Sequence, residues 1–445
     1  MARTHHFPVQ ANIPIYSVDF VQDDLIVYSG GGGVGRSGVT NAVVAARVDL
    51  SAQAIHKLDE LKLSRDEDAP MAMAVNVAKS QIVCGINNAA DGVKKGINQP
   101  IRIFDYSLQQ FTAGSKQTPA DDKGKAKEQS TQHDINVELH FAKAVSSLHL
   151  QNPEEYIKVA TFSPNGRMLA VASTDGQIAL HRYPSLSSIW NDAGEPSSSA
   201  LAAAEAKDTS ISIPSQDFEK SEIYDADFSH SNTHVVFTSS SKLIVYATDP
   251  SPNQMRMTQR PMVTQLATLR KDSHKQSRRS KIPLSVAKAL ALSERLASAV
   301  IRKSFVTAWD ADTWDLIETR HVSDRPVTVF DVSPDGNFLA YGSSDLSIGV
   351  LDAKTLRPVL KILHAHDFPP TCLKFNPASN LLISASADNT LRVIPIPAKA
   401  LLESASSGGA LAFISETRMG FYTTIFLSLL IAAVALWVQR NYLIK

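Results

Sequence analysis

The chain has 445 residues, of which 44 are Lys or Arg and 44 are Asp or Glu, so its formal net charge is zero. This balance argues against a nucleic-acid-binding protein, which usually carries excess positive charge, and against an acidic disordered chain. Apolar residues make up 44% of the chain, an ordinary fraction for a globular protein with a large core. Two cysteines, Cys84 and Cys372, are too few for a disulfide framework or a four-thiolate zinc site, and they fit a reducing compartment.

The first unusual feature in chain order is a cluster of glycines after a strand-like segment that starts at Leu25. Six of the 20 glycines lie within nine residues: Gly30, Gly31, Gly32, Gly33, Gly35 and Gly38. Residues 33–38 match the G-x-G-x-x-G pattern of dinucleotide-binding proteins, with Asp59 in the place of their acidic residue. Residues 30–37 nearly match a phosphate-binding loop, except that Arg36 replaces the lysine. Both motifs need a helix directly after the glycines, whereas residues 41–49 lie where the repeats described next predict a strand.

Four segments of the chain share the pattern strand, turn, strand, turn, strand. Each has an apolar run between two turns rich in Pro, Asn, Asp, Ser or Gly, which is typical of a β-meander. The four begin at Phe162, Phe228, Val332 and Phe375. The interval from Phe330 to Phe375 is 45 residues, within the range of one WD repeat. The copy that ends at Val393 resembles the WD-repeat consensus most closely.

In that copy His366 and Asp388 occupy the histidine and turn-aspartate positions of a WD repeat, and Trp309-Asp310 resembles the end of another copy. Asp175 and Asp345 recur at the same position as Asp388, which indicates a structural and not a catalytic role.

The repeats predict an all-β fold, a seven-bladed WD-repeat β-propeller over residues 1–397. We expect blades near 14–50, 70–106, 155–183, 222–247, 284–319, 324–353 and 366–396. Polar, Ser/Ala-rich or Lys-rich composition favours solvated loops, and we expect such insertions near 112–150, 186–220 and 250–283.

The C-terminal segment has the character of a single membrane span. Residues 420–438 contain no charge and no proline, and Phe421, Tyr422 and Trp437 lie near the two ends, where aromatic side chains favour the membrane interface. The sequence therefore predicts a linker at 398–418, a transmembrane helix at 419–439 and a short lumenal tail at 440–445. Because the N-terminus lacks an apolar signal segment, the propeller is expected to face the cytosol.

Other candidate sites have weaker support in the sequence. The basic run 270–281 suits anionic lipid, but such runs are more often solvated loops. The pairs His5-His6 and His364/His366 suggest a metal site, yet no Cys, Asp or Glu at ligand spacing accompanies them. The sequence holds no recognisable catalytic triad, zinc-protease motif or pair of catalytic carboxylates.

Residues 13–41 resemble the N-terminal blade of the Sec-twelve/PREB family. These are WD-repeat guanine-nucleotide exchange factors of the endoplasmic reticulum. The resemblance is carried by Ile13-Pro-Ile-Tyr-Ser, by the strand and four glycines from Leu25 to Gly33, and by Gly38-Val-Thr-Asn41. Val39 replaces the usual isoleucine. The order of propeller and C-terminal span also matches the family.

The resemblance implies an exchange factor that activates the Sar-type small GTPase at the endoplasmic reticulum membrane and starts COPII vesicle budding, without covalent chemistry. The residues implied in promoting exchange are Val39, Thr40 and Asn41. Those implied in contacting the GTPase are Gly35, Arg36, Gly38, Val39 and Asn41. Those implied in binding a potassium ion are Gly31, Gly32, Gly33 and Asn41. Glycine-rich backbone can direct several carbonyl groups to one point, and backbone carbonyls suit K⁺.

Several alternatives remain open at the level of sequence. Asn41 either orders the glycine-rich loop through side-chain hydrogen bonds or reaches into the GTPase. The glycines alternatively serve only as a flexible hairpin connection. The whole protein is alternatively a membrane-tethered scaffold for coat or cargo proteins without exchange activity, or a nucleotide-binding enzyme that would bind NAD or ATP.

Overall fold

The chain divides into two compact units, residues 1–395 and 396–445. The structure is a computed structural model. The residues that it describes are 6–34, 38–111, 134–150, 152–189, 221–239, 242–248, 256–261, 291–293, 303–309, 315–397 and 400–401. Nearly all of the described residues therefore belong to the first unit.

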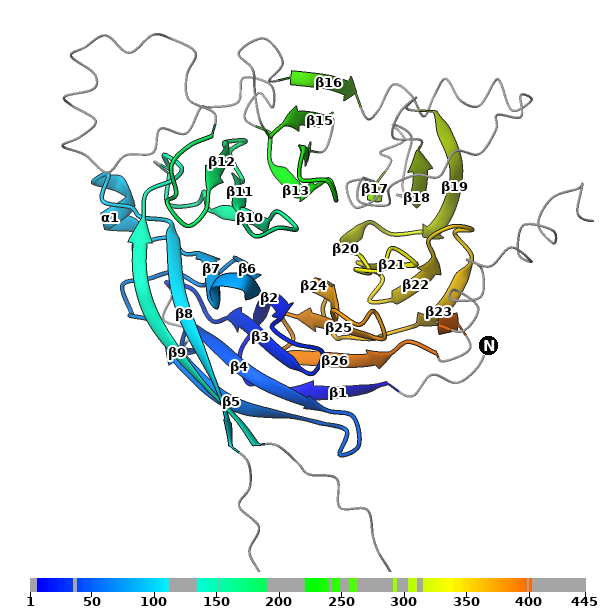
Figure 1. The fold of residues 1–445 in the computed structure, drawn as a ribbon, viewed down its shortest axis with the longest axis horizontal. Helices are drawn as coiled ribbons and strands as arrows, with labels where there is room; N and C mark the ends of the chain where they lie inside the picture. Colours follow the sequence, from blue (N-terminus) through cyan, green and yellow to red (C-terminus); the bar gives the residue numbers. More distant parts are fainter. Residues whose placement is uncertain are drawn as a thin grey trace, which may run out of the picture. The chain divides into compact units, whose positions relative to one another are not determined.

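The first unit consists of antiparallel sheets that follow one another around a ring (Figure 1). The first sheet contains β2 (Ile15–Phe20), β3 (Leu25–Gly30), β4 (Ala42–Asp49) and β5 (Ala54–Lys62). The second contains β6 (Ala72–Asn76), β7 (Gln81–Gly85), β8 (Ile101–Phe111) and β9 (Asp134–Val145). A 3-10 turn (Val77–Lys79) follows β6, and the short helix α1 (Ala90–Lys94) lies between β7 and β8.

The remaining sheets continue around the ring in chain order. The third contains β10 (Ile157–Phe162), β11 (Met168–Ser173) and β12 (Ile178–Arg182). The fourth contains β13 (Ile223–Phe228), β14 (His234–Ser239), β15 (Lys242–Ala247) and β16 (Arg256–Pro261). The fifth contains β17 (Ala291–Ser293), β18 (Ser304–Trp309) and β19 (Leu316–Ser323). The sixth contains β20 (Val327–Val332), β21 (Phe338–Ser343), β22 (Ile348–Asp352) and β23 (Pro358–Ile362). The seventh contains β24 (Pro370–Phe375), β25 (Leu381–Ser386), β26 (Thr390–Pro395) and β1 (Phe7–Gln10).

The hydrophobic core lies between neighbouring sheets. Apolar side chains of the inner strands form separate clusters at successive sheet-to-sheet contacts. The fourth and fifth sheets meet where Trp309 of β18 packs against Val236 and Leu243. Because the strands are buried on both faces, they read as nearly continuous apolar runs, as at Ile26, Val27 and Tyr28.

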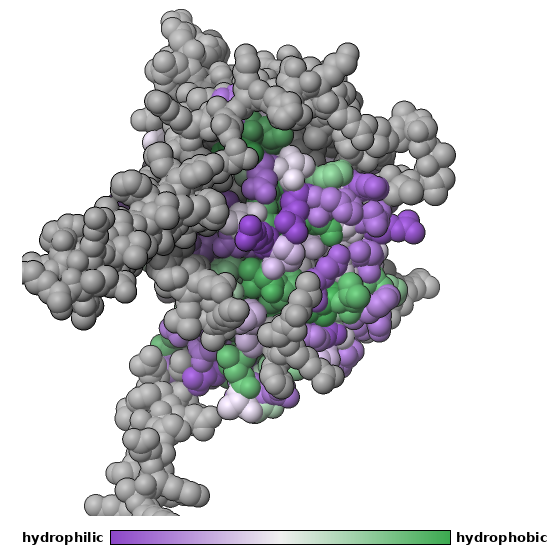
Figure 2. Space-filling model, turned by 90° about the vertical axis from the view of Figure 1, so that its right-hand side faces the viewer, coloured by the Kyte–Doolittle hydropathy of each residue, from purple (hydrophilic) through white to green (hydrophobic). Residues whose placement is uncertain are grey.

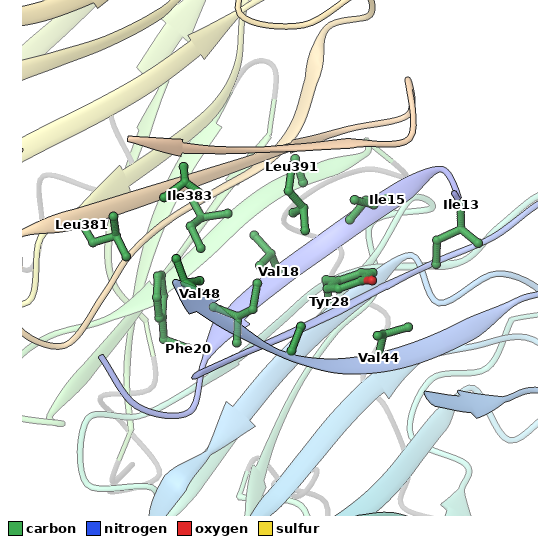
Figure 3. Packing of buried hydrophobic residues seen from close by; sticks show 14 of the residues in the cluster. Ile13, Ile15, Val18, Phe20, Tyr28, Val44, Val48, Leu381, Ile383 and Leu391 are labelled. Carbon is green, nitrogen blue, oxygen red and sulfur yellow. The ribbon is translucent and has the colours of Figure 1, made fainter. Parts of the chain in front are cut away.

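The ring is closed by the first strand of the chain. β1 pairs with β26 in antiparallel register, with Phe7 opposite Val393, so the N-terminal strand completes the last sheet. Side chains of the first and seventh sheets then pack together between the two sheets (Figure 3). The repeat pattern predicted a last blade at 366–396, and it does not include this fourth strand. Closure removes an unpaired edge, which is otherwise prone to aggregation.

The expected all-β propeller is confirmed. Among the described residues, five of the sheets have four strands and the third and fifth have three, so a complete four-stranded blade is present at five of the expected positions.

The structural role expected of His366 and Asp388 is also confirmed: His366 Nε2 lies 2.7 Å from Ser384 Oγ, and its Nδ1 lies 3.2 Å from Asp388 Oδ2. Hydrophilic residues cover much of the described surface on the side seen in Figure 2, with smaller hydrophobic areas between them.

One expected boundary is wrong. The insertion predicted near 112–150 is shorter, because residues 134–145 form β9, which pairs with β8 from Phe111↔Asp134 to Ile101↔Val145. Alternating apolar residues at Val137 and Leu139 explain this strand. Within the region predicted as 250–283, residues 256–261 form β16. Residues 112–133 and most of the two other insertions, including the basic run 270–281, lie outside the described residues.

No helix in the described part of the chain is long and apolar enough to cross a membrane. The expected span at 419–439 and tail at 440–445, with nearly all of the linker at 398–418, lie outside the described residues.

Candidate functional site

The candidate site is the glycine turn, residues 31–41, which connects β3 to β4 in the first sheet. Residues 31–34 and 38–41 of this turn are described. A strand, β4, begins directly after it at Ala42. Dinucleotide and phosphate loops require a helix there, so both nucleotide-binding interpretations are wrong for this turn. Asp59, their acidic residue, lies in β5, where its Oδ2 accepts a hydrogen bond from the Leu139 amide at 2.7 Å.

Two glycines of the turn are required by its geometry. Gly31 has a φ of 145°, and a Cβ at this position would lie 2.3 Å from Asn41 Oδ1. Gly33 has a φ of 73°, in the left-handed region, and a Cβ there would lie 3.1 Å from Asp68 Oδ1. Any other residue would be strained at both positions, and at Gly31 it would also displace Asn41.

Asn41 is buried beneath the turn and holds it through side-chain hydrogen bonds. Its side chain is buried, with 6% of the residue exposed. Its Oδ1 accepts a hydrogen bond from the Gly33 amide at 3.0 Å, and its Nδ2 donates to the Glu67 carbonyl at 3.0 Å and to the Gly33 carbonyl at 3.4 Å. Of the two roles left open by the sequence, the structure supports the first: Asn41 orders the turn through side-chain hydrogen bonds.

A second support comes from the connection between β5 and β6, residues 63–71. Asp68 Oδ1 accepts hydrogen bonds from the Val34 amide at 3.1 Å and from the Ala69 amide at 2.7 Å. Burial raises the pKa of the nearby Tyr16, and the negative charge of Asp68 raises it further. Glu67 and Asp68 were not among the predicted site residues, because a run of charged residues after a strand is typical of a solvated connection.

The remaining residues of the turn differ in their exposure. Val39 is partly buried and packs against the hydrophobic cluster between the first and seventh sheets, so it anchors the turn to the core. Gly38 and Thr40 are exposed, and Val34 is 44% exposed. Gly35 and Arg36, two of the residues implied in GTPase contact, lie outside the described residues.

Three connections meet at the same end of the strands. The glycine turn forms hydrogen bonds with the connection 63–71. The connection 63–71 in turn forms hydrogen bonds with the connection 86–100, which contains α1. The Asp68 amide donates to the Asn87 carbonyl at 2.8 Å, and the Ala89 amide donates to the Asp66 carbonyl at 2.7 Å. Ile97 of the third connection is 65% exposed. These three connections together are called the glycine-turn face below.

A cavity of about 770 Å³ lies elsewhere. The residues that line it include Lys79, Arg167 and Asn232, from connections at the opposite ends of the strands, and Arg182, the last residue of β12. This cavity is therefore separate from the glycine-turn face. In the described part of the chain, no three His, Cys, Asp or Glu side chains come together as metal ligands.

The chain is similar to known WD40 proteins. Residues 143–181 and 357–394 match the family described as WD domain, G-beta repeat. The guanine nucleotide-exchange factor SEC12 of Candida glabrata is 25% identical over 396 residues, which cover 86% of this chain and 71% of that protein. SEC12-like protein 2 of Arabidopsis thaliana is 21% identical, over 82% of this chain and 74% of that protein. The crystal structure of the WD40 β-propeller domain of Doa1 is 10% identical, with a TM-score of 0.48, over 89% of this chain and 99% of that one.

These similarities extend well beyond the glycine turn, because the two curated proteins match more than four fifths of the chain. The resemblance that residues 13–41 indicated is thereby confirmed: this chain is similar over most of its length to SEC12 and SEC12-like proteins, and two of its segments match the WD40 repeat.

Proposed function

We propose that this protein is a guanine-nucleotide exchange factor that activates a Sar-type small GTPase at the endoplasmic reticulum and so starts COPII vesicle budding. The observation that carries the proposal is the similarity, over 86% of the chain, to a protein named as the exchange factor SEC12. The ordered glycine turn supplies a site for it. Exchange of this kind needs no bond to be made or broken in the protein. It needs only tighter binding of the nucleotide-free GTPase than of the GDP-bound form.

In this proposal the glycine-turn face is the docking surface. Its exposed residues Val34 and Ile97 offer apolar contacts beside the turn, and Thr40 and Gly38 offer accessible backbone. Asn41 and Asp68 bond to the Gly33 and Val34 amides, and in this proposal they order that part of the turn before the partner arrives. Such preorganisation lowers the entropic cost of ordering a loop on binding. Asn41 and Val39 therefore support exchange by fixing the turn from its buried side. Gly35 and Arg36 remain proposed GTPase contacts.

A potassium ion is part of the same proposal. We propose as its ligands the backbone carbonyls of Gly31, Gly32 and Gly33 and the amide oxygen of Asn41, with the Asp68 carboxylate close to Gly33 and bonded to the Val34 amide. These are all hard oxygen ligands, which is the donor type that suits K⁺, and the left-handed Gly33 permits unusual carbonyl directions. Bound K⁺ would hold the turn rigid. Replacing K⁺ by Li⁺ is expected to slow exchange and also to lower the thermal midpoint of the isolated protein.

We further propose that residues 419–439 anchor the protein in the endoplasmic reticulum membrane with the propeller in the cytosol. The uncharged run 420–438 supports this assignment, because about 20 apolar residues suffice to cross a bilayer as a helix.

The proposed function is tested by comparing affinities. The full chain in nanodiscs is titrated with nucleotide-free and with GDP-bound Sar-type GTPase. An exchange factor should bind the nucleotide-free form at least about tenfold more tightly, because this ratio is what expels GDP. Equal affinity for the two forms would identify a scaffold without exchange activity, and no binding of either form would contradict the proposed partner.

A further inference from the structure

Arg102 is a buried arginine that connects two of the three segments of the glycine-turn face. It lies in β8, and its side chain is only 5% exposed. Its Nε donates to Glu67 Oε1 at 2.9 Å, and its Nη2 donates to Asn88 Oδ1. Glu67 belongs to the connection 63–71 and Asn88 to the connection 86–100, and the two residues also form an isolated β-bridge. One buried guanidinium group therefore fixes both the connection 63–71 and the connection 86–100.

Glu67 in turn contacts the glycine turn. Its backbone carbonyl accepts the hydrogen bond from Asn41 Nδ2, and the other oxygen of its carboxylate, Oε2, accepts one from the Ser64 amide at 3.0 Å. A continuous series of bonds thus leads from Arg102 through Glu67 and Asn41 to the Gly33 amide.

The stability of the core does not by itself explain this arginine. On the same face of the sheet, Phe104 of β8 and Cys84, the residue opposite Arg102 in β7, are fully buried, so an apolar residue would also pack at this depth. Its Nη1 is a buried donor with no hydrogen-bond partner among the described residues. Burying a guanidinium group is costly, and replacing a buried ion pair by apolar residues is often neutral or stabilising. What the planar guanidinium offers is a fixed angle between two partners, which lysine does not provide.

We propose that Arg102 is a positioning residue for nucleotide exchange, which sets the place of Glu67 and through it the conformation of Asn41 and the glycine turn. This role rests on the proposed exchange function, but its structural part can be measured without a GTPase. The Gly33 and Val34 amides donate to Asn41 Oδ1 and Asp68 Oδ1, so their hydrogen exchange reports directly on the order of the turn.

The first measurement is hydrogen exchange of the full chain in nanodiscs, resolved to peptides. Arg102→Gln is expected to speed exchange at Gly33 and Val34 by about tenfold or more, while the amides of β4 keep their protection. Arg102→Lys is expected to show nearly the same loss of protection at Gly33 and Val34, since a single ammonium group does not hold two partners at a fixed angle.

The matched control is Arg47, whose Nε donates to Asp24 Oδ2 at the same distance, 2.9 Å, at the opposite end of the first sheet. Arg47→Gln should leave the turn amides unchanged. If Arg102→Gln does not fold, Glu67→Gln tests the same bond while keeping the Glu67 carbonyl that Asn41 needs, and it should also speed exchange in the turn.

The second measurement is GDP release from a Sar-type GTPase at rising concentrations of each variant. Arg102→Gln should lower the maximal rate about tenfold, and Arg47→Gln should not change it. Unchanged turn protection in Arg102→Gln, or equal loss of protection throughout the propeller, would overturn the positioning role. An inactive wild-type protein would instead refute the proposed function, while the hydrogen-exchange result would still decide whether Arg102 orders the turn.

Discussion

Asn41 and Glu67, 26 residues apart in the chain, are joined by a hydrogen bond of 3.0 Å from the Asn41 side chain to the Glu67 carbonyl. This bond links the glycine turn of the first sheet to the connection that leads into the second. Because Asn41 also bonds to both the amide and the carbonyl of Gly33, one buried side chain fixes a turn whose exposed residues are available to a partner.

Gly31→Ala should disrupt the turn more than a glycine substitution in open space. The added Cβ would lie 2.3 Å from Asn41 Oδ1 and 2.5 Å from Asn41 Cα, so Asn41 must move. Gly96→Ala is the control, because Gly96 has a left-handed φ of 73° with nothing near its Cβ. We expect Gly96→Ala to cost about 1 kcal/mol of unfolding free energy and Gly31→Ala at least about 2 kcal/mol. Urea unfolding measures both values, and equal costs would contradict the close approach of Gly31 to Asn41.

Phe7→Ala should weaken the closure of the ring. Phe7 is 8% exposed and packs in the cluster between the first and seventh sheets, while its backbone pairs with Val393. Removal of a buried phenylalanine side chain costs about 3 kcal/mol or somewhat more. Gln10→Ala, at an exposed position of the same strand, should change the unfolding free energy by less than about 0.5 kcal/mol. If both substitutions have the same small effect in urea unfolding, β1 does not close the ring in solution.

The propeller is expected to lose stability in mild acid through His181. Burial lowers the pKa of this histidine to about 4, and its ring contacts Ser147 Oγ at 2.6 Å and the Leu186 carbonyl at 3.1 Å. Below pH 6.5 the unfolded chain protonates this group while the folded chain does not, so the folded state loses stability as the pH falls from 6.5 towards 4. The expected loss is about 2 kcal/mol between pH 7.5 and pH 5.

His181→Gln should reduce this dependence on pH, even though it lowers stability overall. An identical slope for wild type and His181→Gln would contradict the assignment.

The repeated turns made the propeller predictable from sequence. The pairing that closes the ring was not predicted, and the reason is physical. Ser333-Pro-Asp-Gly is a local signal: Ser333 Oγ donates to Asp335 Oδ1 at 2.6 Å, and Gly336 takes a φ of 70°. The pairing of β1 with β26 depends on residues 380 or more positions apart, as in Phe7↔Val393, and no local pattern indicates it.

The same contrast holds at the site. The glycines and Asn41 stand out because their residue types and spacing form a motif. Glu67 and Arg102 reach the turn only through tertiary contacts, from the next connection and the next sheet, so nothing in their own neighbourhoods marks them. The only signal in the sequence near Glu67 was the charged run at 65–68, which lies shortly before the apolar strand β6.

The most direct test of the account is GDP release from a Sar-type GTPase carrying a fluorescent nucleotide, measured with wild-type full chain and with Asn41→Ala in K⁺ buffer. Asn376→Ala is the matched control: Asn376 is buried, and its side chain holds the turn at the opposite end of the seventh sheet by accepting hydrogen bonds from the Leu381 and Asn380 amides. The account predicts rapid release with wild type, a rate at least about tenfold lower with Asn41→Ala, and an unchanged rate with Asn376→Ala at a temperature where it remains folded. Wild-type release by the Asn41→Ala variant would contradict the role of the glycine turn, and no release by the wild-type chain would contradict the exchange function itself.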